Sequence, residues 1–424
     1  MSSKPASVRQ RTARMSSDSG IREAKDIGRS GEGLAARLLR RVVAQIEAGH
    51  ITVVLPSGNR IEHRGTRPGN HATLVLHRWR ALRRLVSQGD IGFAEAYIEG
   101  DWSSPDLAAF LELAGRNITL LDKRISGFWP VRMLNRLRHL MRTNSRSGSR
   151  RNIAFHYDLG NDFYRCWLDK GMTYSSALYE HPGQTLDDAQ EAKLDRVVGL
   201  MDLRGGENVL EIGCGWGALA LKLARAGARV TGITLSREQL AFARQRVQQE
   251  NLSGKISLER TDYRDVEGTY DRIVSIEMLE AVGETYWPVY FRTLHERLKT
   301  GGTAVLQVIT IDEARFESYR ATPDFIQRYI FPGGMLPTKS IIAEHAVAAG
   351  LDPVSMQHFG ASYATTLAEW RRLFRESWPK VEAMGFPARF RRLWEYYLCY
   401  CEAGFRTGII DVGFYVLSKA KANA

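Results

Sequence analysis

The segment VLEIGCGWGALA, residues 209–220, has the pattern of a buried strand, a glycine-rich turn and the first residues of a helix. Its glycines, Gly213, Gly215 and Gly217, would let the backbone come close to a ligand at the carboxyl end of the strand. Open α/β sheets bind cofactors at that place. A glycine-rich turn also occurs where nothing binds, so the flanking sequence has to decide between a cofactor site and a tight turn.

Short apolar strands and amphipathic helices alternate around this segment. The series runs NVLEIG, LALKLARAG, RVTGITL, QLAFARQRVQQ, DRIVSIE and TAVLQVIT. This alternation predicts a doubly wound parallel α/β sheet. From about residue 323 the pattern predicts inserted helices, and DVGFYVLSKA near the end of the chain predicts a closing strand.

The glycine spacing favours S-adenosylmethionine over NAD as the cofactor. NAD-binding turns follow G-x-G-x-x-G, with an acidic residue about twenty positions later. Here the spacing is G-x-G-x-G, Glu211 precedes it, and the next strand ends in GITLSREQ without an acid. The segment resembles the first motif of class I methyltransferases, whose backbone cradles the amino acid and ribose of S-adenosylmethionine.

The next strand ends are predicted to complete this site. Thr234 and Gln239 offer neutral hydrogen-bonding groups to the ribose, and Tyr263 and Arg264 are expected to flank the adenine. The predicted cofactor-binding residues are Tyr174, Ser175, Glu211, Gly213, Cys214, Gly215, Gly217, Thr234, Gln239, Tyr263 and Arg264.

The N-terminal part of the chain has a different pattern of predicted strands and helices. Residues 51–65 alternate around a Pro-Ser-Gly-Asn turn like a β-hairpin, and residues 76–114 are mostly helical in pattern, with a cap at residues 103–106. At 424 residues the chain is long enough for two to three domains. The predicted division is a flexible basic tail (1–33), a smaller, mostly helical domain (34–142), a polar linker TNSRSGSRRN (143–152) and a catalytic domain (153–424).

The charge balance predicts an anionic partner. Lys and Arg outnumber Asp and Glu by 59 to 47, a net charge of +12, which suits nucleic acid or an anionic lipid surface. Four cysteines without a secretory signal point to the reducing cytoplasm. Since we find no apolar run near about 18 residues, we expect any membrane contact to be made from the surface.

From His156 onward, eight motifs resemble the cyclopropane-fatty-acyl-phospholipid synthase family, to which the mycolic acid cyclopropane synthases are related. They are HYDLGNDFYRCWLD, MTYSSALYE, VLEIGCGWG, GITLSREQ, IEMLEAVG, YIFPGGMLPT, FGASYATTLAEW and YYLCYCEAGF, in the family's order. The resemblance covers about residue 150 to the end. Residues 76–107 also resemble the N-terminal lipid-binding domain of longer bacterial members, which tend to be dimers, so a homodimer is a possible state.

The resemblance implies methyl transfer from S-adenosylmethionine to a cis double bond in an unsaturated phospholipid acyl chain, followed by proton loss and ring closure. An alkene is a poor nucleophile, so the site must align the reactants and exclude water. Aromatic faces can stabilise the resulting carbocation, and core packing is the alternative role for each candidate. The candidates are Tyr157, Phe163, Trp167, Tyr174, Tyr290, Tyr363 and Tyr397.

In this family the base is a bound bicarbonate. Glu280 and Tyr363 match two of its family ligands, whereas the family's cysteine and histidine are here Ser176 and Gln307. Gln can donate hydrogen bonds to an anion but cannot carry a positive charge. These departures leave open a product with a methylene or methyl branch instead of a ring, and they also support a non-catalytic lipid-binding protein as an alternative.

A nucleic-acid methyltransferase is a further alternative that the charge would suit. Amino-methylating members of that class usually carry a D/N/S-P-P-Y/F segment after the fourth strand, where this chain reads SIEMLEAVG. We therefore expect no nucleic-acid partner. The expected location is the cytoplasmic face of the membrane, and the basic segment HRWRALRR, residues 77–84, is either the membrane-facing element or a solvated helix face.

The C-x-C pair in YYLCYCEAGF raises its own question. Residues two apart on a helix point about 200° away from each other, so Cys399 and Cys401 cannot form a disulfide there. A structural zinc needs four ligands, and no second pair or histidine cluster supplies them. Cys401 coincides with the family's active-site cysteine and is predicted to line the site as a protonated thiol, and Cys399 to pack in the core.

Overall fold

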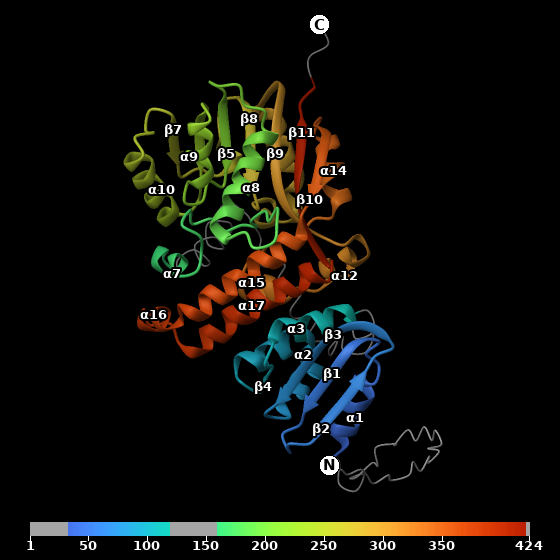
Figure 1. Cartoon of the computed structure of the whole chain (residues 1–424). Coiled ribbons are helices and arrows are strands. Elements are labelled where there is room, and N and C mark those ends of the chain that lie inside the picture. Colours follow the sequence, from blue (N-terminus) through green and yellow to red (C-terminus); the bar gives the residue numbers. More distant parts are fainter. Residues whose placement is uncertain (1–32, 119–158, 421–424) are drawn as a thin grey trace, which may run out of the picture.

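The computed structural model describes residues 33–118 and 159–420. Figure 1 shows two lobes, a smaller N-terminal one and a larger one built on a long sheet, with helices α15 and α17 between them. The predicted tail up to residue 32, the predicted linker 143–152 and Tyr157 lie outside the described residues.

The larger lobe contains a seven-stranded sheet in the order β10-β11-β9-β8-β5-β6-β7. Strands β5 to β9 run parallel to one another, and β11 is antiparallel to both β9 and β10. The doubly wound α/β fold and the closing strand are therefore confirmed. The strands are β5 (Asn208–Ile212), β6 (Arg229–Ile233), β7 (Ile256–Glu259), β8 (Tyr270–Ile276), β9 (Leu298–Ile311), β10 (Asp352–His358) and β11 (Ile410–Ser418).

Helices connect these strands and form the insertions that were expected after residue 323. The α-helices are α7 (Asn161–Arg165), α8 (Leu186–Leu200), α9 (Ala218–Arg225), α10 (Arg237–Gln249), α11 (Trp287–Arg297), α12 (Phe316–Ala321), α13 (Phe325–Tyr329), α14 (Lys339–Ala348), α15 (Gly360–Glu376), α16 (Trp378–Ala383) and α17 (Ala388–Arg406). Short 3₁₀ helices are η1 (Tyr263–Asp265), η2 (Leu279–Ala281), η3 (Glu284–Tyr286) and η4 (Glu313–Arg315).

Strand order fixes the position of the site. The chain moves outward from β5 to β6 and β7, then returns to the other side of β5 with β8. The carboxyl ends of β5 and β8 therefore flank the point at which the strand order reverses, where ligands bind in such sheets. The glycine-rich turn follows β5, and Glu277 follows β8.

The N-terminal lobe corrects the prediction of a mostly helical domain. Within residues 33–118 it contains a four-stranded sheet in the order β2-β1-β3-β4 beside three helices. The expected hairpin is present, and Asp106 caps its helix by accepting a hydrogen bond from the backbone of Ala109. The elements are α1 (Leu34–Val43), β1 (Ala48–Val54), β2 (Arg60–Arg64), β3 (Arg67–Leu76), α2 (Arg80–Ile98), β4 (Trp102–Ser103) and α3 (Leu107–Arg116).

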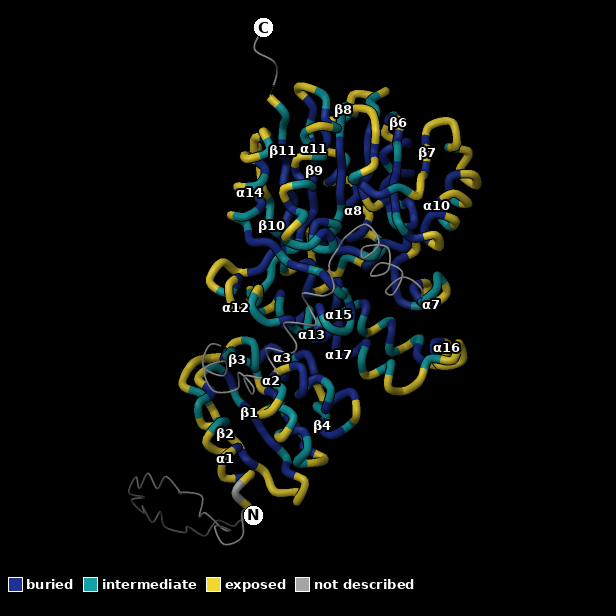
Figure 2. Tube along the Cα trace, turned by 180° about the vertical axis from the view of Figure 1, so that it is seen from behind, coloured by how far each residue is buried: buried dark blue, intermediate teal, exposed yellow. Residues whose placement is uncertain are grey.

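Helix α17 joins the lobes, because it packs against α15 on one side and against α2 and α3 on the other. The ring of Tyr396 lies 5.6 Å from that of Tyr97 in α2, and Arg389 pairs with Glu99 at 2.9 Å. Figure 2 shows buried residues along the central strands and exposed residues on the outer loops. In the described ranges, no helix is both long and apolar enough to cross a bilayer.

Candidate active site

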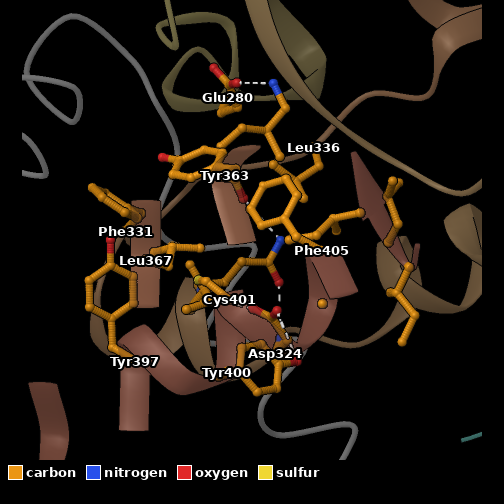
Figure 3. A pocket seen from close by; sticks show the side chains of 18 of the residues that line it. Glu280, Asp324, Phe331, Leu336, Tyr363, Leu367, Tyr397, Tyr400, Cys401 and Phe405 are labelled. Atoms are coloured by element: carbon orange, nitrogen blue, oxygen red, sulfur yellow. Dashed lines mark hydrogen bonds between the residues drawn. The ribbon is translucent and has the colours of Figure 1, made fainter. Parts of the chain in front are cut away.

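One cavity of about 850 Å³ runs from the glycine-rich turn into the N-terminal lobe. Its glycine-turn end is the part of the wall that contains Gly213, Gly215, Thr234, Gln239 and Tyr263. Its apolar end is the part made by Leu39, Val43, Ile51, Leu74, Phe110 and Ala114 of the N-terminal lobe. Figure 3 shows the middle of the cavity, where Cys401 and Leu367 lie among Phe331, Tyr363, Tyr397 and Phe405.

The glycine-rich turn leaves space for a ligand. Gly215 has φ 51°, and a Cβ added there would meet nothing within 4 Å, so the backbone borders open cavity. Gly213 and Cys214 also lie in the wall. Gly217 does not, and its contact with a cofactor stays a prediction. A Cβ there would approach Ala243 to 3.1 Å, so this glycine lets α9 pack closely on α10.

The strand ends beside the turn supply polar groups. Thr234 follows β6 and its hydroxyl donates to the side chain of Gln239 at 3.0 Å, while Ser236 caps α10 by accepting the Gln239 backbone N–H. Tyr263 lies in the wall, but Arg264 does not. The Arg264 guanidinium makes a bidentate pair with Asp262, at 2.7 and 2.8 Å, so its place beside the adenine stays a prediction.

A buried lysine beside Glu211 was not anticipated. Lys193 of α8 donates to the hydroxyl of Ser175 at 2.8 Å, and both residues lie in the wall with Glu211. Burial lowers the pKa of Lys193 and raises that of Glu211, and their mutual attraction opposes both shifts. Oε2 of Glu211 has no hydrogen-bond partner among the described residues. This acid, the open turn and the Thr234–Gln239 pair fit the cationic amino acid and ribose of S-adenosylmethionine.

Glu277 is the residue that sequence reasoning missed. Its carboxylate accepts hydrogen bonds from the Ser176 backbone N–H at 2.9 Å, the Gln307 amide at 2.7 Å and the Tyr363 hydroxyl at 2.7 Å. Glu277 and Tyr363 lie in the cavity wall. A positive φ of 48° at the end of β8 marks its backbone as unusual, but the sequence carries no signal for that angle.

Ser176 and Gln307 are therefore corrected as direct contacts of a bound anion. Both side chains are fully buried and neither lies in the cavity wall. The Ser176 hydroxyl donates to the carbonyl of Ala177 at 2.8 Å. The Gln307 side chain is directed to Glu277, because Gln307 lies on β9 beside the end of β8, where the Glu277 N–H donates to its carbonyl at 2.8 Å.

Glu280, three positions after Glu277, lies in the wall of the cavity. One of its oxygens accepts the backbone N–H of Ile309, and the other has no partner among the described residues. Burial, together with the charge of Glu277, raises the pKa of Glu280 to about 8. At neutral pH Glu280 thus tends to hold a proton while Glu277 accepts three hydrogen bonds.

The cysteines of α17 lie in different surroundings. Cys401 lies in the cavity wall, and burial first, then the charge of Asp324, raises the pKa of its thiol. Cys399 is fully buried outside the wall, and burial raises its thiol pKa to about 12. Three of the aromatic candidates, Tyr174, Tyr363 and Tyr397, lie in the wall, and the hydroxyls of Tyr174 and Tyr397 are 2.8 Å apart.

Phe163, Trp167 and Tyr290 are buried outside the cavity wall and pack the core. The basic segment begins a helix whose apolar residues Leu82 and Leu85 reach the wall. Arg80 in this segment is engaged structurally, because it pairs with the buried carboxylate of Asp101 at 2.7 Å.

Comparison with known proteins gives one consistent result. The family model described as mycolic acid cyclopropane synthetase matches residues 144–414. Tuberculostearic acid methyltransferase UfaA1 of Mycobacterium tuberculosis is 39% identical over 89% of each chain, and cyclopropane-fatty-acyl-phospholipid synthase of Escherichia coli is 33% identical over 81% of this chain and 86% of its own. The crystal structure of mycolic acid cyclopropane synthase CmaA1 complexed with SAH and CTAB has a TM-score of 0.60 and 31% identity, covering 64% of this chain and 98% of that one.

Proposed function

Since the chain belongs to the mycolic acid cyclopropane synthetase family of S-adenosylmethionine-dependent enzymes that modify lipids, we propose that it methylates the cis double bond of an unsaturated phospholipid acyl chain and closes a cyclopropane ring. The observation that carries this proposal is the continuous cavity between the glycine-rich turn and the apolar N-terminal lobe. An acyl chain can lie along the apolar end, which brings its double bond toward the cofactor.

S-adenosylmethionine, when bound, supplies an electrophilic methyl group on a sulfonium. The chain's own residues hold the reactants and keep water away. Tyr174, Tyr363 and Tyr397 present aromatic rings to the middle of the cavity, where they can stabilise positive charge on the acyl chain. Because the double bond has little nucleophilicity, alignment inside a closed apolar wall supplies most of the advantage over reaction in water.

A phospholipid substrate implies that the protein contacts an anionic membrane surface peripherally, on the cytoplasmic side. We propose no nucleic-acid partner, and we propose a homodimer as the oligomeric state. Helix α2 supports this contact, because Val86 is 72% exposed and Arg83 is exposed, and they directly follow the wall residues Leu85 and Leu82 in sequence. A helix of this kind can place apolar groups in the lipid interface and a cation at the head groups. The double variant Arg83→Glu/Val86→Glu is expected to reduce binding to anionic vesicles, whereas exposed Arg237→Glu on α10 is the control.

Mass spectrometry of lipids from cells that express the protein and contain monounsaturated phospholipids tests the main proposal. A gain of the mass of one CH₂ group by the acyl chains is expected. Resistance of the modified chain to hydrogenation separates a ring from a methylene branch. Unchanged lipids, with folded protein and cofactor present, would refute the proposal.

A methylene- or methyl-branched chain is the second candidate product. Two findings favour it: the Ser176 backbone N–H and the Gln307 amide donate to Glu277 and not to a free anion, and the relative with 39% identity is called a tuberculostearic acid methyltransferase. A different position of the base relative to the carbocation would remove a different proton. Hydrogenation of the modified lipids therefore decides between the two products.

A further inference from the structure

The hydrogen-bond donors around Glu277 form a complete anion site that is already filled. Ser176, Gln307 and Tyr363 come from three distant parts of the chain, yet each gives its hydrogen bond to the same carboxylate. These three positions, with Glu280, are the ones that the family resemblance assigned to bicarbonate. A carboxylate and a bicarbonate offer the same planar pair of acceptor oxygens, so the side chain of Glu277 satisfies the donors that a free anion would need.

The backbone of Glu277 is held in an uncommon conformation to achieve this. Its φ of 48° lies in the left-handed region, which costs free energy for a residue other than glycine. The conformation is secured by the hydrogen bond from the Glu277 N–H to the Gln307 carbonyl at 2.8 Å. Strain of this kind persists where the surrounding structure determines it, and it is concentrated at functional sites.

Glu277 also lies where a base is needed. In the cavity wall it adjoins Met278, which lies against Gly213 of the glycine-rich turn, and it accepts the hydrogen bond of Tyr363. The residue as a whole is half-buried and lines the cavity, while its carboxylate lies deep in the protein. Burial raises its pKa, while the hydrogen bonds from Ser176 and Tyr363 and the charge of Lys193 oppose that rise. A buried carboxylate with a raised pKa is a stronger base than an exposed one.

We propose that the carboxylate of Glu277 is the built-in general base of the reaction and takes the place of a bound bicarbonate. This inference rests on the proposed function. The transferred carbon forms a bond with one alkene carbon as its bond to sulfur breaks, and that bonding pair stays on sulfur. For a ring, a C–H bond of the transferred methyl group breaks and its electron pair bonds that carbon to the cationic carbon. For a methylene branch, a hydride first shifts from the methylated carbon to the cationic carbon, and the pair of the broken methyl C–H bond then forms the new double bond. In both cases the proton bonds to a Glu277 oxygen.

Two substitutions of Glu277 test this role. Glu277→Gln keeps the shape and can accept from Ser176 and Gln307 while its NH₂ group donates to the Tyr363 hydroxyl, but it is no base. Glu277→Gly suits the left-handed backbone and opens the donor set to a small anion. Asp202→Gly is the matched control, because it removes an acid at φ 47° on an exposed turn outside the cavity wall.

Turnover with monounsaturated phospholipid vesicles and binding of S-adenosylmethionine by calorimetry are measured for each protein. We expect Glu277→Gln to lower kcat by about 100-fold or more, with cofactor affinity retained. Bicarbonate should bind to cofactor-free Glu277→Gly, detected by ¹³C NMR of the labelled anion, and should restore part of its turnover. Wild-type and Asp202→Gly turnover should not respond to removal of carbon dioxide and bicarbonate.

Three results would overturn the proposal. They are near-normal turnover of Glu277→Gln, loss of cofactor binding as the main defect of both variants, and a wild-type protein that needs added bicarbonate. Failure of the proposed function is distinct, since the wild-type protein itself would then leave the phospholipids unmodified under every condition. If Glu277→Gln does not fold, bicarbonate binding and rescue of Glu277→Gly still decide the matter.

Discussion

The glycine-turn end of the cavity is made by short contiguous segments after β5, β6 and β7, whereas the apolar end is assembled from α1, β1, β3, α2 and α3 together with α17 of the other lobe. The first end depends on backbone shape at a few positions, such as Gly215. The second depends on the combined surface of many apolar side chains, and no single one of them is required. The two ends should therefore respond differently to single substitutions.

The largest effect is expected at Gly215. In Gly215→Val the new side chain enters the open space beside the turn and the left-handed backbone becomes strained, so affinity for S-adenosylmethionine should fall by about 100-fold. Titration calorimetry measures it. Gly183→Val is the matched control, because Gly183 also has a positive φ and open space but lies outside the cavity wall. If both variants lose the same affinity for S-adenosylmethionine, backbone strain is the cause and not the loss of space in the cofactor site.

A smaller effect is expected at the apolar end. Ala114→Phe places a ring in the cavity within the N-terminal lobe, so turnover of long-chain phospholipids should fall by about 10-fold while cofactor affinity stays unchanged. Steady-state rates with a series of acyl lengths measure the change. Ala109→Phe, on the same helix but outside the wall, is the control. If short and long chains are affected equally, the acyl chain does not extend to Ala114.

Between the two ends, Glu280 should give the protein a pH-dependent stability. Its folded pKa of about 8 exceeds the ordinary 4.5, so the folded state keeps a proton that the unfolded chain releases between those pH values. The free energy of unfolding should therefore fall as pH rises through this window, by up to about 1.4 kcal/mol per pH unit relative to Glu280→Gln. Urea denaturation at pH 5.5 and 7.5 measures it, with exposed Glu267→Gln as the control. Parallel pH profiles of wild type and Glu280→Gln would contradict the assignment.

The smallest effect is expected at Cys401. Burial keeps its thiol protonated, and the double bond of the substrate is itself the nucleophile, so covalent catalysis is not required. Cys401→Ser should retain at least about half of the wild-type kcat/KM. Complete loss of activity in a folded Cys401→Ser variant would instead make the thiol essential. Cys399→Ser, outside the cavity wall, is the companion variant.

The sequence predicted the catalytic fold well, because alternating strands and helices have distinct apolar periods. It missed the sheet of the N-terminal lobe for a physical reason. Strand β3 begins with RPGNH and alternates in burial only in its second half, and β4 has two residues, so neither gives a strong local pattern. Strand β3 depends on pairing with β1, and β4 depends on pairing with β3.

By itself the sequence determined the doubly wound α/β fold, the glycine-rich turn and the family, since each depends on contiguous residues with a local backbone preference. Only the tertiary structure decided which carboxylate receives the hydrogen bonds of Ser176, Gln307 and Tyr363. Glu277 and Glu280 are three residues apart and chemically identical. The left-handed turn after β8 and the placement of donors from distant segments distinguish them, because hydrogen bonds depend on position in space and not on order in the chain.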